Sequence, residues 1–248
     1  MIDIHSHILP HIDDGSSSIE ESLEIARIAA KSGIRHIVAS SHGNCFEYTI
    51  EEYHKQLALL QERLRQEDIP VELHPGMEIF MDRNVVSLLD EGKLLTVNNT
   101  KYVLVEFRFE DNIPHVEKRI LELLESGYKP ILSHPERYVF MQREPEFAHY
   151  LEDCGCAMQL NHGSITGKFG ERVRHLSLHF LDSGVAGLIA TDTHNATHRT
   201  PSLERLKAVM EGHYSAKDIE LLLQGNPEKI LKGEPILRRK ELRLGIDF

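Results

Sequence analysis

The chain has 248 residues, of which 41% are hydrophobic and 27% are charged, the ordinary composition of a globular protein. Its net charge of −11 disfavours a nucleic-acid-binding protein, because nucleic acid attracts basic surfaces. No apolar run approaches the roughly 20 residues of a membrane-spanning helix, so no membrane insertion is expected.

Short apolar runs predict β-strands along the whole chain. In chain order they cover residues 1–5, 34–40, 71–74, 101–106, 130–133, 157–161 and 187–191. Segments with helical periodicity lie between them. Repeated alternation of strand and helix is typical of a parallel sheet with crossover helices.

Polar residues and glycines mark the ends of the predicted helices. Ser18 with Glu21, and Thr49 with Glu52, have the spacing of a capping box, and Gly33 ends the first of these helices. The later helices are predicted over residues 114–126, 144–153, 171–182 and 202–211.

The order of these elements predicts an α/β fold. No glycine-rich dinucleotide turn follows the first strand, which favours a closed or nearly closed barrel over a Rossmann sheet. There is no internal repeat or linker, so we predict a single domain over residues 1–248. A basic tail at about 237–248 is interpreted as a solvated end rather than a contact with a partner or membrane surface.

Residue types that bind metals follow most of the predicted strands. They are His5, His7, Asp13 and Asp14 after the first strand, His42, Glu78, Glu106, His134, and Asp192 with His194 after the last. Any one of them alone is more often a loop or capping residue. The active sites of parallel barrels lie at the carboxyl ends of the strands, so these side chains are predicted to converge there.

Spacing strengthens this prediction. His5 and His7 are two residues apart, so in an extended chain both imidazoles share a face, and Asp192 and His194 repeat the pattern. Glu106 stands in the apolar run VLVEF, where a carboxylate is costly to bury without a cation. The coincidence of six strand ends predicts a multinuclear metal site.

Nine ligands exceed the needs of one ion, so two or three ions are expected. Ions about 3.5–4 Å apart activate water and stabilise both oxygens of a phosphoryl displacement. Arg137 and Arg199 are placed to grip the phosphate, although each has the alternative of a solvated surface position.

Other hydrolytic nucleophiles are disfavoured. None of Cys45, Cys154 and Cys156 has an arginine six residues later, as a thiol phosphatase loop requires, so all three are interpreted as structural. The sequence contains no GxSxG turn and no P-loop. The cysteines form no disulfide ladder and the start has no signal peptide, which predicts a cytoplasmic protein.

Six motifs together carry a family resemblance. They are MIDIHSHILP at the start, SH at 41–42, PGMEI at 75–79, YVLVEF at 102–107, PILSHPER at 130–137 and ATDTHN at 190–195. Together they resemble the PHP (polymerase and histidinol phosphatase) superfamily. In order and spacing they are similar to the bacterial protein-tyrosine phosphatases of the CpsB/CapC type. The resemblance implies a distorted, TIM-like (β/α)7 barrel with a trinuclear site.

The resemblance also implies roles for individual residues. His5, His7, Glu78 and Asp192 would hold one ion, and Glu78 would bridge to a second ion held by Glu106 and His134. Asp14, His42 and His194 would hold the third ion. Arg137 and Arg199 would bind the phosphate, with Asp192 and His194 also counted among the catalytic residues. Family members often carry a basic or imidazole residue after the histidine at 42, where this chain has Gly43.

The implied activity is metal-dependent hydrolysis of phosphotyrosine on a protein, a tyrosine autokinase that controls capsule or exopolysaccharide synthesis. The mixed histidine and carboxylate ligands favour Mn²⁺, with Fe, Zn or Mg as alternatives. Alternative functions are a small-molecule phosphatase, such as one acting on histidinol phosphate, and a non-catalytic metal-binding module. An amidohydrolase is disfavoured because no predicted strand end carries the lysine that such enzymes carboxylate.

Overall fold

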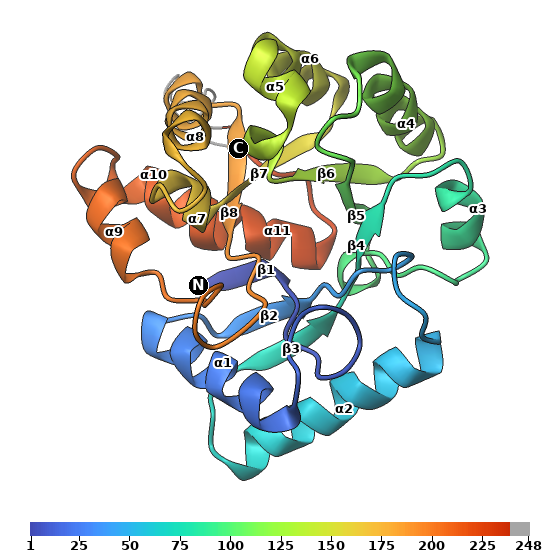
Figure 1. The fold of residues 1–248 in the computed structure, drawn as a ribbon, viewed down its shortest axis with the longest axis vertical. Helices are drawn as coiled ribbons and strands as arrows, with labels where there is room; N and C mark the ends of the chain where they lie inside the picture. The colour runs from blue at the N-terminus through green and yellow to red at the C-terminus, as the bar shows by residue number, and fades with distance from the viewer. Residues whose placement is uncertain (239–248) are drawn as a thin grey trace.

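The structure is a computed structural model that describes residues 1–238 of the chain. Parallel strands alternate with helices that surround them (Figure 1). The described strands are β1 (Ile2–Ser6), β2 (His36–Ala39), β3 (Glu72–Pro75), β4 (Glu78–Phe80), β5 (Tyr102–Glu106), β6 (Lys129–Ser133), β7 (Ala157–Asn161) and β8 (Ala186–Ala190).

The helices lie mainly between consecutive strands. They are α1 (Ile19–Ser32), α2 (Ile50–Gln66), α3 (Val85–Asp90), α4 (Ile113–Glu125), α5 (Val139–Arg143), α6 (Glu146–Cys154), α7 (His162–Ile165), α8 (Glu171–Ser183), α9 (Glu204–Glu211), α10 (Ala216–Glu220) and α11 (Asn226–Lys232). Shorter turns of helix are η1 (Val97–Asn99), η2 (Pro135–Arg137) and η3 (Leu221–Gly225). Among residues 1–238, no helix has the length and apolarity needed to cross a membrane.

The predicted α/β fold is confirmed, with one strand more than the seven predicted. The additional strand, β4, begins only three residues after β3 and is itself three residues long, too short to show a period of its own. Gly76 lies between them, and a Cβ there would stand 2.5 Å from Val38 Cγ1. The close approach to β2 therefore requires glycine at this position.

Helix starts follow the predicted chemistry with one difference. Thr49 and Glu52 form the predicted reciprocal capping box of α2. Ser18 caps α1 by accepting a bond from Glu21 N, but the Glu21 carboxylate binds the backbone N–H and hydroxyl of Ser17 instead of Ser18. The expected capping box is thus only half present at α1.

The strands form two parallel sheets, β1-β2-β3 and β4-β5-β6-β7-β8. Two isolated bridges join the sheets, Ser6 with Thr193 and His42 with Glu78. Around the first bridge, His7 N donates to Thr193 O at 2.8 Å. The wall therefore nearly closes, as predicted, and its two seams meet at the end where the metal-binding residue types lie.

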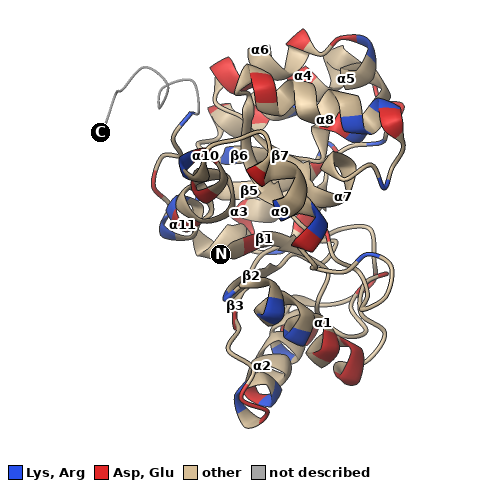
Figure 2. Ribbon diagram, turned by 90° about the vertical axis from the view of Figure 1, so that its left-hand side faces the viewer, with Lys and Arg blue, Asp and Glu red and all other residues tan. Residues whose placement is uncertain are grey.

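Apolar side chains fill the space inside the strands. Ile4, Val38, Leu104 and Leu188 are fully buried in this inner cluster. Ile230 of α11 belongs to the same cluster, so this helix covers one end of the barrel. Figure 2 shows α11 on one side of the strands and α7 on the other. Because α7 directly follows β7, the carboxyl ends of the strands face away from α11.

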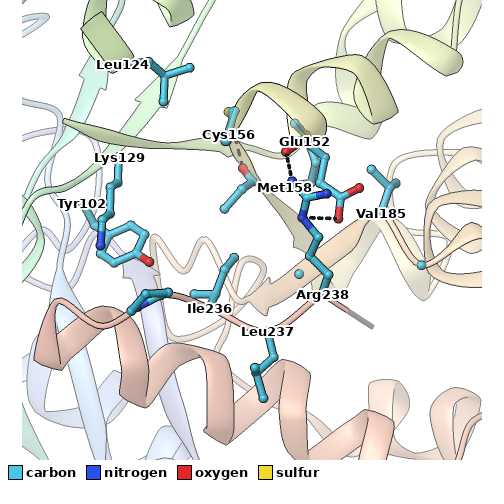
Figure 3. Close-up of a pocket in the computed structure, with 15 residues that line it drawn as sticks. Tyr102, Leu124, Lys129, Glu152, Cys156, Met158, Val185, Ile236, Leu237 and Arg238 are labelled. Carbon is cyan, nitrogen blue, oxygen red and sulfur yellow. Dashed lines mark hydrogen bonds and ion pairs between the residues drawn. The ribbon is translucent and has the colours of Figure 1, made fainter. Parts of the chain in front are cut away.

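A cavity of about 350 Å³ lies near the amino ends of β5 to β8, and residues 235–238 line it (Figure 3). Arg238 forms an ion pair with Asp153 at 3.0 Å and donates to the carbonyl of Glu152 at 2.7 Å. The first residues of the predicted basic tail therefore pack against α6, unlike a fully solvated end. Arg239, Lys240 and Arg243 lie outside the described residues.

Candidate metal centre

All nine predicted ligands lie around one end of the strands. His5 is in β1 and His7 follows it, Glu106 ends β5, His134 directly follows β6, and Asp192 and His194 follow β8. Asp14 and His42 lie in the loops after β1 and β2. Glu78 is the first residue of β4, and its bridge with His42 places it at this end of the barrel.

Four donor atoms lie close together in the buried part of the centre. His5 Nε2 lies 3.3 Å from His7 Nε2 and 3.1 Å from Glu78 Oε2. Asp192 Oδ1 lies 3.5 Å from His5 Nε2 and 3.6 Å from His7 Nε2. Donors bound about 2.1 Å from one ion stand roughly 3.0–3.5 Å apart in tetrahedral or octahedral geometry. This group therefore has the dimensions of a metal site.

Glu78 reaches a second group with its other oxygen. Glu78 Oε1 lies 3.2 Å from His134 Nε2, and Glu106 Oε2 lies 4.0 Å from the same nitrogen. His42 Nδ1 lies 3.0 Å from Glu106 Oε1. The two oxygens of Glu78 thus face different donor groups, as a bridging carboxylate does.

The third group is the most open. Asp14 Oδ1 lies 3.6 Å from His42 Nε2 and 3.5 Å from His194 Nε2. The Asp14 side chain is 54% exposed, whereas those of Glu78 and Asp192 are each 2% exposed. His42 directs one nitrogen to this group and the other to the second group, so it lies between them. The centre opens to solvent on the Asp14 side.

A buried ring nitrogen of His42 supports the metal interpretation. His42 Nδ1 has no hydrogen-bond partner. His42 Nδ1 is within 3.0 Å of a carboxylate oxygen yet has no hydrogen-bond geometry with it. Two atoms that both bind one ion lie close together without a hydrogen bond, because each directs a lone pair at the ion. The residues present therefore fit a set of divalent ions.

A second layer of side chains sets the orientation of the ligand rings. His7 Nδ1 donates to Asp13 Oδ2 at 2.7 Å, and His5 Nδ1 donates to Gln159 Oε1 at 2.8 Å. Each bond fixes the tautomer that leaves Nε2 with a free lone pair. Asn161 Nδ2 donates to Asp192 Oδ2 at 2.8 Å. Gln159 and Asn161, two residues apart in β7, are site residues that no motif in the sequence indicates.

Charge and burial keep two buried carboxylates and one imidazole of the centre in their metal-binding forms. Burial alone would raise the pKa of Glu78, but His5 and a hydrogen bond with His134 hold it well below its usual value. Burial opposes ionisation of Asp192 too, while His5 and Arg199 keep its pKa low. Burial and the neighbouring His7 lower the pKa of His194 to about 2. The carboxylates are therefore ionised and this imidazole is neutral at neutral pH.

Both predicted arginines reach the centre. Arg199 Nη2 lies 2.5 Å from Asp192 Oδ2, and Arg137 Nη1 lies 3.3 Å from the same oxygen. The Arg137 guanidinium lies between the rings of Phe109 and Phe169, 4.8 Å and 4.6 Å from their centroids. These contacts exclude the alternative of freely solvated arginines. Both guanidinium groups instead stand beside the metal-binding groups, where they can bind an anion.

The backbone is strained at two ligands. His134 has φ 37° and Asp192 has φ 52°, both in the left-handed region that residues with a side chain rarely adopt. His134 directly follows β6, and Asp192 lies two residues after the end of β8. Such strain costs of order 1–3 kcal/mol and clusters at functional sites.

Cys45 is exposed, so it is not part of the apolar core. Partial burial of its thiol and the nearby carboxylates of Glu106 and Glu78 raise its pKa to about 11. A thiol with this pKa is protonated at neutral pH and is a poor nucleophile. The expectation of non-thiol chemistry is thereby strengthened.

The fold and the donor set define a nearly closed parallel α/β barrel with a candidate multinuclear metal centre at its mouth. Residues 1–232 match the model of the family described as capsular polysaccharide synthesis, CpsB/CapC, and the chain belongs to this family.

Relatives extend along nearly the whole chain. It is 36% identical over 242 residues to the tyrosine-protein phosphatase YwqE of Bacillus subtilis (strain 168), covering 96% of this chain and 94% of that protein. It is 29% identical over 243 residues to the tyrosine-protein phosphatase CpsB of Streptococcus pneumoniae, covering 95% and 100%. A solved structure described as YwqE and CpsB, unique metal-dependent tyrosine phosphatases, matches with a TM-score of 0.90 at 34% identity, covering 96% and 97% of the two chains.

Proposed function

We propose that this protein is a metal-dependent protein-tyrosine phosphatase. The observation that carries the proposal is the cluster in which the oxygens of Glu78 and Asp192 each lie 3.1–3.6 Å from the ring nitrogens of His5 and His7, with two arginines on the outer oxygen of Asp192. Relatives described as tyrosine-protein phosphatases support the same reaction.

The nine predicted ligands would hold two or three ions, with Glu78 shared between the first and second. When bound, such ions activate water and stabilise the oxygens of an in-line phosphoryl displacement. The mixed imidazole and carboxylate donors favour Mn²⁺ as the resident ion, with Fe, Zn and Mg as alternatives. Asp13 and Gln159 would hold the ligand rings of His7 and His5 in their metal-binding tautomer.

Arg137 and Arg199 would hold the phosphate. Their side chains are 20% and 27% exposed, so a substrate anion can reach them from solvent. The aromatic sandwich fixes the plane of the Arg137 guanidinium, which reduces the ordering that binding requires. Fixed donors of this kind stabilise charge as it develops on the phosphoryl oxygens.

Aromatic side chains at the mouth favour a phenolic substrate. Phe46 is 40% exposed and stacks on His42 with 5.6 Å between ring centroids. Phe109 is 38% exposed and its ring lies 6.1 Å from that of His134. A tyrosyl ring entering beside them would gain aromatic contacts that a serine phosphate cannot make. Its phenolate, with a pKa of about 10, is also a better leaving group than an alkoxide.

As the substrate protein we propose a tyrosine autokinase, and the family description supports the link to capsule synthesis. We place the reaction in the cytoplasm, since all three cysteines are free thiols. The candidate ligands come from segments between β1 and the loop after β8. This distribution along the chain supports one catalytic domain.

The test is a comparison of substrates after complete metal removal and reloading with Mn²⁺. Peptides of one sequence carrying phosphotyrosine, phosphoserine or phosphothreonine are compared with histidinol phosphate. We expect kcat/KM to be highest for phosphotyrosine and activity to require the added ion. Faster turnover of histidinol phosphate, or full activity after verified metal loss, would refute the proposal.

A further inference from the structure

A second group of metal-binding residue types lies away from the candidate metal centre. It consists of His36, Glu72 and His74, whose donor atoms all lie within 4.8 Å of one another. His36 is the first residue of β2 and Glu72 is the first residue of β3. The group therefore stands toward the amino ends of the strands, the side on which Figure 2 shows α11, whereas the candidate metal centre gathers at the opposite end.

The parallel pairing of β2 and β3 builds this group. His36 is the register partner of Glu72, so their side chains lie on one face of the sheet. Glu72 and His74 are two residues apart in β3 and share that same face. The sheet thus holds two imidazoles and one carboxylate together without help from a flexible loop.

The distances match those between ligands of a single ion. His36 Nδ1 lies 3.1 Å from His74 Nε2 and 3.6 Å from Glu72 Oε2. Ligands about 2.0–2.1 Å from a tetrahedral ion stand roughly 3.3–3.4 Å apart, between these two values. A hydrogen bond between the two rings accounts for the shorter distance but leaves the carboxylate without a role.

His74 is half-buried, so the surrounding chain encloses its ring. The nearby Asn98 side chain donates to Leu231 O at 2.9 Å. Asn98 holds a left-handed backbone with φ 49°, which asparagine tolerates better than most residues.

We propose that His36, Glu72 and His74 form a second metal site, separate from the candidate metal centre, for a borderline divalent cation such as Zn²⁺. Two nitrogens and one carboxylate oxygen leave a fourth position for water, a donor set that suits Zn²⁺ better than the harder Mg²⁺. Glu72 is 65% exposed and His36 is 38% exposed, so an ion can enter directly from solvent.

The position of the site defines its role. β3 is an edge strand of the smaller sheet, and the barrel wall is interrupted between β3 and β4. An ion held by His36 on β2 and by two residues of β3 ties this edge strand to its neighbour. It would stabilise the folded chain without touching the residues assigned to phosphate binding or hydrolysis.

The test is Zn²⁺ stoichiometry of the full chain, measured by equilibrium dialysis and elemental analysis for the wild type, His36→Gln and His74→Gln. The matched control is His175→Gln. His175 is 74% exposed and lies 3.8 Å from the Glu171 carboxylate, but among the described residues no third metal-binding side chain joins this pair. We expect both cluster variants to bind one Zn²⁺ fewer per chain than the wild type and the control. Activity on a phosphotyrosine peptide with Mn²⁺ should be the same in all four proteins.

Glu72→Gln provides a variant that will fold, because the side chain it changes is mostly exposed. We expect at least a tenfold weaker affinity for the additional Zn²⁺ and loss of the increase in melting temperature that Zn²⁺ gives to Mn²⁺-loaded wild type. Equal Zn²⁺ stoichiometry in the wild type and both histidine variants would overturn the proposal. An unchanged affinity in Glu72→Gln would overturn the three-ligand site.

Discussion

Replacing Arg199 with alanine separates phosphate binding from metal binding. Arg199 approaches Asp192 Oδ2 to 2.5 Å and leaves a buried Nε without a hydrogen-bond partner, so it has donor capacity for a substrate anion. A hydrogen bond to a charged group contributes about 1.5–3 kcal/mol. The removal of one transition-state donor from a water-excluded site costs about 2.7–4 kcal/mol. Because Arg199 is 27% exposed, solvent weakens its effect, and we expect a loss of about 2–3 kcal/mol.

This loss corresponds to a decrease of about 30- to 150-fold in kcat/KM, since each 1.36 kcal/mol is a factor of ten. Arg137→Ala should show a decrease of similar size, because Arg137 reaches the same oxygen of Asp192. Ion content should stay close to the wild-type value. Arg199 contributes to the low pKa of Asp192, but His5 contributes more, so the carboxylate stays ionised at neutral pH without the arginine.

The assay combines steady-state kinetics on a phosphotyrosine peptide with elemental analysis of the same samples. Arg65→Ala is the control, since Arg65 is 70% exposed on α2 and pairs with Glu62. Arg137→Lys adds a further comparison, because lysine keeps the charge but has no planar group to lie between two phenyl rings. Normal kinetics in both arginine→alanine variants would remove these residues from the site. If the variants lost bound ions in proportion to their loss of activity, the two arginines would only support Asp192.

Two further predictions concern the ligands. Glu78→Ala should abolish ion binding at two of the three groups and nearly all turnover, because Glu78 is shared between those groups. The far-UV circular dichroism should be retained, because the apolar core is separate from the centre. Normal ion content in this variant would contradict the prediction. Burial lowers the pKa of His7, but Asp13 and Glu78 more than offset burial and raise it well above its usual value, so a proton competes with the ion for this ring. Ion occupancy, followed by dialysis across pH 5–8, should fall as the pH is lowered, and loading that is constant over this range would refute ligation by His7.

The convergence of the candidate ligands was predictable because its signal is local. A histidine or carboxylate placed just after an apolar run can be recognised without knowledge of the partners, and the parallel topology brings the strand ends together. Gln159 and Asn161 gave no such signal. Their role depends on β7 lying opposite His5 and Asp192, and nothing in the sequence near 159–161 specifies those neighbours. An uncharged polar residue in a strand also has a smaller desolvation cost than the carboxylate that made Glu106 conspicuous.

The surroundings of Arg137 were equally inaccessible from sequence. Phe109 follows β5 and Phe169 follows α7, so the aromatic sandwich joins three segments that are distant in the chain. The left-handed backbone at His134 and Asp192 is imposed by tertiary structure in the same way, since neither residue type requires it. Spacing identified the chemistry, and packing determined its geometry.

The first donor group also spans both seams of the barrel wall. His5 and His7 belong to the smaller sheet, whereas Glu78 and Asp192 belong to the larger sheet or directly follow it. Among residues 1–238 one isolated bridge joins the sheets at each seam, so an ion bound by these four residues would link them where the wall is weakest. Metal binding should therefore stabilise the seams more than the interior of either sheet.

Amide hydrogen exchange with and without Mn²⁺ measures this effect directly. The seam amides are those of His7, bonded to Thr193 O, and Gly43, bonded to Glu78 O, both at 2.8 Å. At an ion concentration 100 times Kd, binding stabilises the closed state by about 2.7 kcal/mol, so ion removal should speed exchange of these amides by about 100-fold. Amides between β5 and β6, inside the larger sheet, should change far less. A uniform change across both sheets would show that the ions stabilise the fold globally, and no change at the seams would show that they do not link the two sheets.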